Sequence, residues 1–226
     1  MSDRVLITGC STGIGAATAL LLAQRGKQVV ATARRIETLE PLAQEARRLR
    51  ATLLTTPLDV TDDASRQAAF RFAEEQLGGV DILINNAGYG QMGPVEEVPV
   101  ELARAQFETN VFGLHAMCQL VLPGMRARGY GKIVNISSIV GKISLPLGGV
   151  YSASKFAVEG LTDALRIEVA PFGIRVILIL PGPIRTEFPR TAALSVEPML
   201  SKLPNSPYRS LAEPMLSRWR SGKPRA

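Results

Sequence analysis

A glycine-rich turn near the start of the chain constrains the fold more than any other feature. Its glycines, Gly9, Gly13 and Gly15, lie between an apolar strand-like run, Arg4–Thr8, and a helix-like run rich in Ala and Leu, Ile14–Gln24. Glycine lets the backbone turn tightly and approach a ligand, and the helix that follows offers free N–H groups and a positive dipole end to an anion. The order strand, turn, helix predicts a pyrophosphate-binding loop, although the glycine spacing differs from the common G-x-G-x-x-G.

The rest of the chain alternates between strand-like and helix-like runs. Apolar runs rich in β-branched residues predict strands that are buried on both faces, at Val5–Thr8, Gln28–Thr32, Thr52–Thr56, Ile82–Asn85, Lys132–Ile136 and Arg175–Leu180. Helix-like stretches lie between them, at Ile14–Arg25, Glu37–Arg50, Asp62–Leu77 (with Thr61 or Asp62 as its cap), Val100–Arg128 and Tyr151–Pro171. This alternation predicts an α/β fold: a single-domain, Rossmann-like, doubly wound parallel sheet with helices on both faces.

Length and composition agree with one domain. The 226 residues are 46% hydrophobic, which is enough to build a substantial core. We expect residues 1–186 to form a dinucleotide-binding catalytic domain, and residues 187–226 to add a substrate lid and a basic, proline-rich tail without regular structure. Ligands of such sheets bind at the carboxyl ends of the strands, where the sequence places Gly13, Asp59, Gly88, Ser138 and Pro181.

A Tyr-Ser-Ala-Ser-Lys run provides candidates for acid–base chemistry. If residues 151–171 are helical, Tyr151 and Lys155 share one face, so an ammonium lies beside a phenol. A neighbouring positive charge lowers the pKa of a phenol, and Tyr151 could then pass a proton to or from a substrate oxygen. The same spacing occurs by chance on solvated helices, but the glycine loop favours a redox site.

Further motifs occur in a fixed order around these two. They are Asn85-Asn86-Ala87-Gly88 after a strand, Asn110 in a Thr-Asn-Val-Phe-Gly run, Asn135-Ile-Ser-Ser138, and Pro181-Gly182-Pro183-Ile184-Arg185-Thr186. Together with T-G-x-x-x-G-x-G and Y-x-x-x-K, they make the chain resemble the short-chain dehydrogenases/reductases from Arg4 to about Phe188. It looks most like the hydroxysteroid and retinol dehydrogenase-like members of the single-domain branch. The resemblance implies an oxidoreductase that acts on CH–OH groups with a nicotinamide cofactor.

The resemblance also implies roles for individual residues. Tyr151 would be the general acid or base, Ser138 would polarise the substrate oxygen, and Lys155 would lower the pKa of Tyr151 and hold the nicotinamide ribose. Asn110 would orient a water in the proton relay; alternatively, it is a mid-helix polar group that is satisfied locally. The residues implied around the cofactor are Gly9, Ser11, Thr12, Gly13, Ile14, Gly15, Arg34, Asp59, Val60, Asn86, Ala87, Gly88, Tyr151, Lys155, Pro181, Gly182, Ile184 and Thr186.

The end of the second strand distinguishes the two nicotinamide cofactors. An acidic residue there would bind the ribose hydroxyls of NAD, whereas Arg34 puts a guanidinium where the extra phosphate of NADP would lie. Ser11 could add a hydroxyl. We therefore expect NADP(H) rather than NAD(H). The alternative is that Arg34 and Arg35 begin a solvated helix with Glu37 as their partner.

The expected substrate is a small hydrophobic alcohol, ketone or aldehyde. In the resembled family the loop after the serine helps to shape the pocket, and here that loop is apolar. The expected wall residues are Leu145, Pro146, Leu147 and Val150, joined by Tyr89 and Met92 if the loop after Gly88 faces the nicotinamide. The alternative function is a truncated or non-catalytic NADP-binding regulator, against which the intact Ser138, Tyr151 and Lys155 argue.

Composition bears on partners and compartment. The formal charge is +6, and much of the surplus lies in residues 187–226; without aromatic interleaving, a solvated tail is expected rather than a nucleic-acid partner. Cys10 and Cys118 are the only cysteines, so neither a disulfide framework nor a metal site is expected. We expect a cytoplasmic protein without a signal peptide or a membrane span.

The chain ends before the last helix and seventh strand of the resembled family. Its sixth strand, with the run Val176–Leu180, is apolar on both faces and would be the outermost strand. An open edge of this kind presents unpaired backbone groups and favours association. We expect the shortened sheet to be less stable than a completed one and to self-associate there, which puts the family's usual homo-oligomer in doubt.

Overall fold

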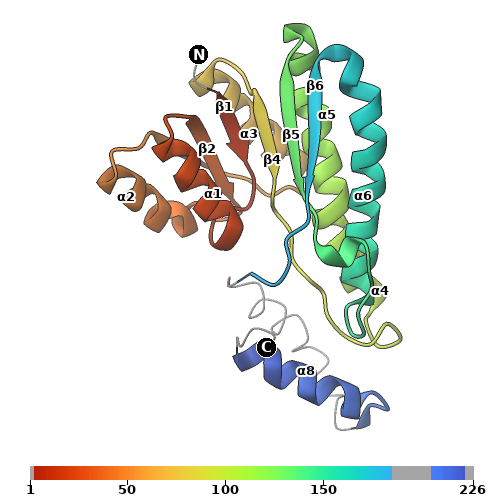
Figure 1. Cartoon of the computed structure of the whole chain (residues 1–226). Coiled ribbons are helices and arrows are strands. Elements are labelled where there is room, and N and C mark those ends of the chain that lie inside the picture. Colours follow the sequence, from red (N-terminus) through yellow and green to blue (C-terminus); the bar gives the residue numbers. More distant parts are fainter. Residues whose placement is uncertain (1–2, 185–204, 222–226) are drawn as a thin grey trace.

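The structure, a computed structural model, describes residues 3–184 and 205–221. Its centre is a parallel six-stranded sheet in the order β3-β2-β1-β4-β5-β6 (Figure 1). The strands are β1 (Arg4–Ile7), β2 (Gln28–Ala33), β3 (Leu53–Pro57), β4 (Ile82–Asn85), β5 (Gly131–Ile136) and β6 (Ile174–Ile179). The strand order reverses between β1 and β4, and such a reversal opens a ligand crevice at the carboxyl ends of the strands.

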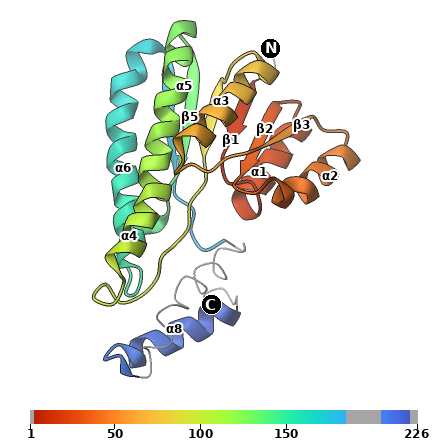
Figure 2. The ribbon, with the colours of Figure 1, turned by 180° about the vertical axis from the view of Figure 1, so that it is seen from behind.

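Helices cover both faces of this sheet (Figures 1 and 2). They are α1 (Gly13–Gln24), α2 (Glu40–Arg48), α3 (Asp63–Leu77), α4 (Val100–Phe107), α5 (Leu114–Arg128) and α6 (Gly149–Val169). A further helix, α8 (Arg209–Ser221), covers neither face and lies beyond the carboxyl ends of the strands. One hydrophobic core packs α1 and α2 against the sheet, and a second packs α3, α5 and α6 against its other face. The expected doubly wound α/β fold is confirmed.

The two cores explain why the strands carry apolar residues on both faces. Val5 and Ile7 pack into the core under α1, whereas Leu6 between them packs into the core under α3 and α5. Successive side chains of a strand point to opposite faces, so a strand covered on both faces reads as a largely apolar run rather than as an alternation of apolar and polar residues.

The prediction of one continuous helix over Val100–Arg128 is wrong in one respect. The helix is interrupted by a π-helical segment, η2 (Glu108–Gly113), between α4 and α5. Gly113 lies against the core residue Val60, and a Cβ at position 113 would be only 2.8 Å from its Cγ2. A π segment re-aims the side chains of a helix and is frequent at functional sites. The expected helix over Glu37–Arg50 instead starts as a tight turn, and α2 begins at Glu40.

The C-terminal part also differs from expectation. Residues 209–221 form α8, although the proline-rich sequence predicted no regular structure there. Ala212 is only 2% exposed because this helix packs against the rest of the protein. Contacts with distant residues therefore outweigh the unfavourable Pro214 within the helix. Thr186 lies outside the described residues, as do residues 187–204 and 222–226 of the expected lid and tail.

The sixth strand forms an edge of the described sheet, where it pairs with β5. Ile174 and Val176 are buried under α6, but Ile177 and Ile179, on the opposite face, are 39% and 44% exposed. Among the described residues, apolar side chains of β6 thus reach solvent at the edge of the sheet. Self-association through this edge stays a prediction, which light scattering can test.

Candidate functional site

The glycine loop joins β1 to α1. Gly9 and Gly13 have φ angles of +73° and +61°, a conformation that side chains rarely adopt. Gly15 packs so closely against the Gly9 carbonyl and the Asn86 side chain that a Cβ at position 15 would clash with both. These positions therefore require glycine, and they bring the backbone into a tight turn.

The segment after β4 supports that turn. The Thr8 hydroxyl accepts hydrogen bonds from the N–H groups of Asn86 (3.0 Å) and Ala87 (2.9 Å). The Asn86 amide donates to the carbonyls of Thr8 (3.0 Å) and Gly9 (2.9 Å). In this structure Asn86 and Ala87 thus stabilise the glycine loop, and Gly88 is exposed at the crevice.

The first turn of α1 fits a dinucleotide pyrophosphate. Thr12 occupies the N-cap position, but its side chain makes no capping hydrogen bond, and the first turn carries no acidic residue. Ser11 and Thr12 are exposed, and Ile14 is half-buried. The free N–H groups of a helix N-terminus, together with these hydroxyls, suit an anion.

Arg34 follows β2 at the same edge of the sheet. Its side chain is exposed, and within the described ranges no hydrogen bond or ion pair engages its guanidinium, so the alternative pairing with Glu37 is not seen. Tyr89 lies near it: burial raises the pKa of the Tyr89 phenol, and the positive charge of Arg34 opposes that shift. Arg34 is therefore placed to meet an anionic group in the crevice.

Asp59 and Val60 follow β3, and their side chains are less free to contact a cofactor than the sequence suggested. Asp59 Oδ1 accepts hydrogen bonds from the backbone N–H and the hydroxyl of Thr61, at 2.9 and 2.8 Å. Val60 is 5% exposed, and its side chain packs against Gly113. The Val60 side chain thus belongs to the core, and a contact with the adenine would have to come from its backbone.

Ser138 and Tyr151 come together from two elements. Ser138 caps the short helix η3 (Ile139–Gly141), and its Oγ accepts a 3.3 Å hydrogen bond from the Val140 N–H. Tyr151 lies in the first turn of α6, is 8% exposed, and forms a hydrogen bond with Ser138. Burial raises the pKa of the Tyr151 phenol, and the bond to Ser138 opposes that rise.

Lys155 lies one turn further along α6. Its Nζ is 5.9 Å from the centroid of the Tyr151 ring and donates a 2.8 Å hydrogen bond to the Ile136 carbonyl at the end of β5. Burial lowers the pKa of Lys155 from 10.5 to about 8, with Glu159 acting in the opposite direction. The expected lowering of the Tyr151 pKa by Lys155 is not seen, because the ammonium faces the ring and a carbonyl, and burial of the phenol is the larger effect. Near neutral pH both groups carry their protons.

Asn110 lies within the π segment η2 and is buried. Its amide donates to the Tyr89 carbonyl (2.9 Å) and to the Ser154 hydroxyl (3.1 Å), while its Oδ1 accepts from the Tyr89 N–H (3.1 Å). The side chain is therefore satisfied by residues of the loop after β4 and of α6, not by local partners on its own helix as the alternative interpretation held. Asn110 connects the loop after β4 to α6, the helix that carries Tyr151 and Lys155. Its role in a proton relay stays a prediction.

The segment after β6 is hydrogen-bonded to the loop that follows β5 and carries Ser138, here called the serine loop. The Pro181 carbonyl accepts a 3.2 Å hydrogen bond from the Ile139 N–H, and the Ile179 carbonyl accepts one of 2.8 Å from the Ser137 N–H. Gly182 is exposed and Ile184 is 50% exposed at this edge.

An apolar cluster surrounds Tyr151 and includes residues that the sequence did not indicate. Beside Tyr151 it contains Met92, Val98, Val140, Leu147 and Ala212, with Leu102, Leu145, Val150 and Met215 packed against it. The wall expected from Leu145, Leu147, Val150 and Met92 is thus assembled, whereas Pro146 is exposed and Tyr89 lies outside the cluster.

The contribution of α8 to this cluster could not be foreseen from local patterns. Ala212 and Met215 are close in sequence to Pro214, which argued against a helix. Two hydrogen bonds hold this part of the chain in place: the Tyr208 hydroxyl donates to Glu96, and the Ser206 hydroxyl donates to Glu97. Figure 1 shows α8 beyond the carboxyl ends of the strands, the side on which the candidate site lies.

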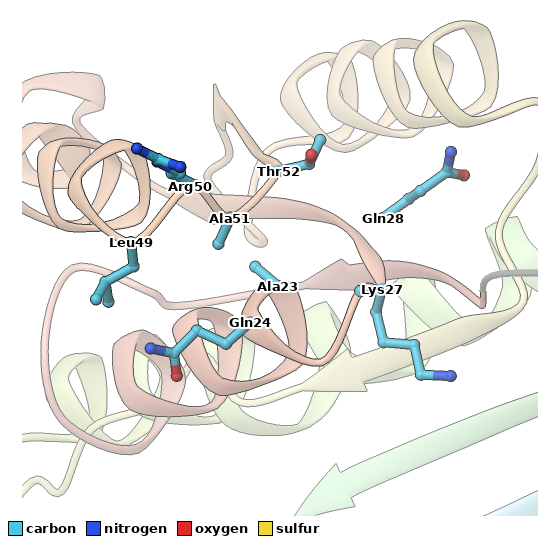
Figure 3. Close-up of a pocket in the computed structure, with 9 residues that line it drawn as sticks. Ala23, Gln24, Lys27, Gln28, Leu49, Arg50, Ala51 and Thr52 are labelled. Carbon is cyan, nitrogen blue, oxygen red and sulfur yellow. The ribbon is translucent and has the colours of Figure 1, made fainter.

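Other parts of the described structure lack these features. A cavity of about 590 Å³ lies at the opposite edge of the sheet (Figure 3) and contains none of the candidate residues. It is lined by Ala23, Gln24, Gly26, Lys27, Gln28, Leu49, Arg50, Ala51 and Thr52. Within the described residues, no cluster of His, Cys, Asp and Glu could hold a metal ion. None of the helices described combines the length and apolarity needed to cross a membrane.

Comparisons with known proteins give the relationship of this chain. A family model described as short chain dehydrogenase matches residues 3–195. Human (Homo sapiens) retinol dehydrogenase 8 is 44% identical over 190 residues, which cover 81% of this chain and 60% of that protein. The 3-ketodihydrosphingosine reductase of Bacteroides thetaiotaomicron is 44% identical over 185 residues, 81% of this chain and 65% of that protein. The chain therefore spans less than two thirds of the length of either relative.

Solved structures agree. Levodione reductase is similar with a TM-score of 0.82 at 33% identity, covering 88% of this chain and 78% of that one. The sequence motifs, the sheet order and these relatives converge. The chain belongs to the short-chain dehydrogenase family, whose members are oxidoreductases with an NAD(P)-binding Rossmann fold.

Proposed function

We propose that this chain is an NADP(H)-dependent oxidoreductase that interconverts hydrophobic alcohols with their ketones or aldehydes. The observation that carries the proposal is the juxtaposition of Ser138, Tyr151 and Lys155 at the carboxyl edge of the sheet, on which the glycine loop also lies. In the proposed division, residues 1–186 bind the dinucleotide and carry the catalytic groups, and residues 187–226 close over the substrate. Cys10 and Cys118 are buried and unpaired, which fits the reducing cytoplasm.

The described side chains suggest how the reaction proceeds. A bound nicotinamide would supply or accept the hydride. Ser138 donates a hydrogen bond to the substrate oxygen, and Tyr151, protonated near neutral pH, transfers its proton to that oxygen as negative charge develops on it. Lys155, held by the Ile136 carbonyl, keeps a positive charge behind the phenol and stabilises the resulting phenolate. In the oxidation of an alcohol the same groups act in reverse.

The apolar cluster around Tyr151 supports a hydrophobic substrate. Its members surround the proposed proton donor with aliphatic side chains and with the thioethers of Met92 and Met215. Pockets of this composition bind apolar ligands and use a few polar groups to orient them. Here the orienting groups would be Ser138 and Tyr151.

The experiment that tests the function measures NADPH oxidation by the purified chain with a panel of apolar ketones and aldehydes. We expect turnover with at least one of them. NADPH binding without turnover across the panel would favour the alternative, a non-catalytic NADP-binding regulator. Absence of both binding and turnover would contradict the proposal.

The cofactor preference rests on Arg34. We expect Arg34→Asp to lower the ratio of kcat/KM for NADPH to kcat/KM for NADH by at least about tenfold, because repulsion replaces a charge-assisted phosphate contact. Arg25→Asp is the matched control, since Arg25 is also exposed but lies at the far end of α1. If the ratio stays the same in both variants, Arg34 is only a solvated surface charge.

A further inference from the structure

A buried carboxylate lies directly behind the proposed catalytic groups. Glu159 is on α6, one turn beyond Lys155, and is only 5% exposed. Residues four apart on a helix lie on the same face, so Glu159 and Lys155 are buried neighbours of opposite charge, and Glu159 acts on Lys155 through its charge without a direct hydrogen bond among the described residues. Apart from its ion pair with Lys142, Glu159 accepts no hydrogen bond at either oxygen within the described residues.

A surface lysine closes this carboxylate off from solvent. Lys142 Nζ lies 2.7 Å from Glu159 Oε2, while the Lys142 side chain is 58% exposed. Lys142 directly follows η3, the short helix that Ser138 caps. The ion pair therefore fastens the serine loop to the helix that carries Tyr151 and Lys155.

The loop backbone closes tightly on the same carboxylate. A Cβ at Gly141 would lie 2.9 Å from Glu159 Oε1 and 2.7 Å from the buried Ser137 hydroxyl, so position 141 has no room for a side chain. The contact between the serine loop and α6 thus depends on Gly141 in the loop and on the Glu159 carboxylate in the helix. Gly141 lies three residues after Ser138 in the sequence.

The buried Glu159 carboxylate is not expected to contribute much to the stability of the fold. A buried ion pair often contributes less to stability than apolar side chains of similar volume, because both charges lose their hydration. Glu159 is nearly enclosed, and its exposed partner is screened by water. The carboxylate lies between the serine loop and Lys155, where it can act on both: it pairs with Lys142 of the loop, and its negative charge favours the protonated form of Lys155.

We propose that Glu159 is a positioning residue of the active site: its carboxylate fastens the serine loop through Lys142 and keeps Lys155 in its charged form. This inference rests on the proposed function. The charged and titratable groups around the pair are Tyr151 and Lys155 on α6 and Lys142 after η3, with Asp163 and Arg166 acting on Lys142 from the next turns of α6. The strand β5 faces Lys155 with the uncharged Ile136 carbonyl, and the loop after β4 faces it with Gly88, which also lies against Asn110 of η2.

The test compares pH profiles of kcat/KM for NADPH, which report groups of the free enzyme. With Lys155 titrating at about 8, activity should fall as the pH rises through that value. Glu159→Gln should move this alkaline limb to lower pH by roughly one unit, since a neighbouring opposite charge is lost. Glu159→Asp, which keeps the charge, should restore most of the wild-type profile. Lys142→Met should lower kcat several-fold without a downward shift of the limb.

The matched control is Asp163→Asn. Asp163 forms an ion pair with Arg166 on the same helix but is 56% exposed, so we expect its profile to match the wild type. Thermal unfolding establishes that each variant is folded. If Glu159→Gln shows the same limb and kcat as Asp163→Asn, the inference is overturned.

A second readout does not depend on turnover. Carbon-13 NMR of lysine-labelled protein follows the titration of the Lys155 Cε resonance, assigned from its loss in Lys155→Met. The titration midpoint should fall in Glu159→Gln. A lower midpoint in a chain that turns over no ketone would mean that the proposed function fails while Glu159 still controls Lys155; an unchanged midpoint would overturn the inference for Glu159.

Discussion

Tyr151→Phe should bind NADPH normally and lose ketone reduction by roughly 10²–10⁴-fold, the usual contribution of a general acid. The phenylalanine ring keeps the apolar contacts of Tyr151 with its cluster but has no proton to transfer. The rate of NADPH oxidation measures the loss, and fluorescence of bound NADPH shows whether the cofactor site is intact.

Tyr130→Phe is the matched control for this substitution. Tyr130 is 39% exposed and directly precedes β5, at the opposite end of the strand from the serine loop. Its ring faces Lys132 and remains in the variant, so activity should not change. Near-normal turnover in Tyr151→Phe would show that another group supplies the proton.

Lys155→Met should abolish turnover and yet stabilise the fold near neutral pH. Burial lowers the pKa of Lys155 from 10.5 to about 8, which corresponds to about 3 kcal/mol of destabilisation at 1.36 kcal/mol per unit. The variant also leaves the Ile136 carbonyl without its donor, at a cost of about 1 kcal/mol. We therefore expect the free energy of unfolding to rise by about 1–2 kcal/mol, and Tm by about 2–4 °C per kcal/mol.

The stability gain of Lys155→Met over the wild type should decrease as the pH rises. Between about pH 8 and 10.5 the unfolded chain holds the lysine proton and the folded chain does not, so wild-type stability rises with pH across this window. In Lys155→Met this rise is absent. Above about pH 10.5 only the lost hydrogen bond to the Ile136 carbonyl remains, so the variant should there be the less stable protein by about 1 kcal/mol. Thermal unfolding at several pH values measures this difference, with Lys132→Met at the other end of the sheet as the control. Equal or lower stability of Lys155→Met near neutral pH would contradict the interpretation of Lys155 as a strained buried charge.

Much of the architecture follows from local sequence patterns. The apolar β-branched runs predicted all six strands of the described sheet to within a residue or two at each end, because a strand covered on both faces is largely apolar. The glycine positions predicted the tight turn before α1, since the left-handed angles at Gly9 and Gly13 exclude most side chains. Helical spacing placed Tyr151 and Lys155 on one face.

Features that depend on contacts between distant residues could be seen only in the folded chain. The π segment at Asn110 accompanies the packing of Gly113 against Val60, and α8 forms where Ala212 meets the cluster around Tyr151. The acid–base properties belong here as well: the burial of Lys155 and the opposing charge of Glu159, rather than its spacing from Tyr151, decide the pKa of Lys155. Periodicity reports which face of an element is buried, whereas a pKa or a helix break depends on what packs against that face, and this is decided only when the whole sheet is assembled.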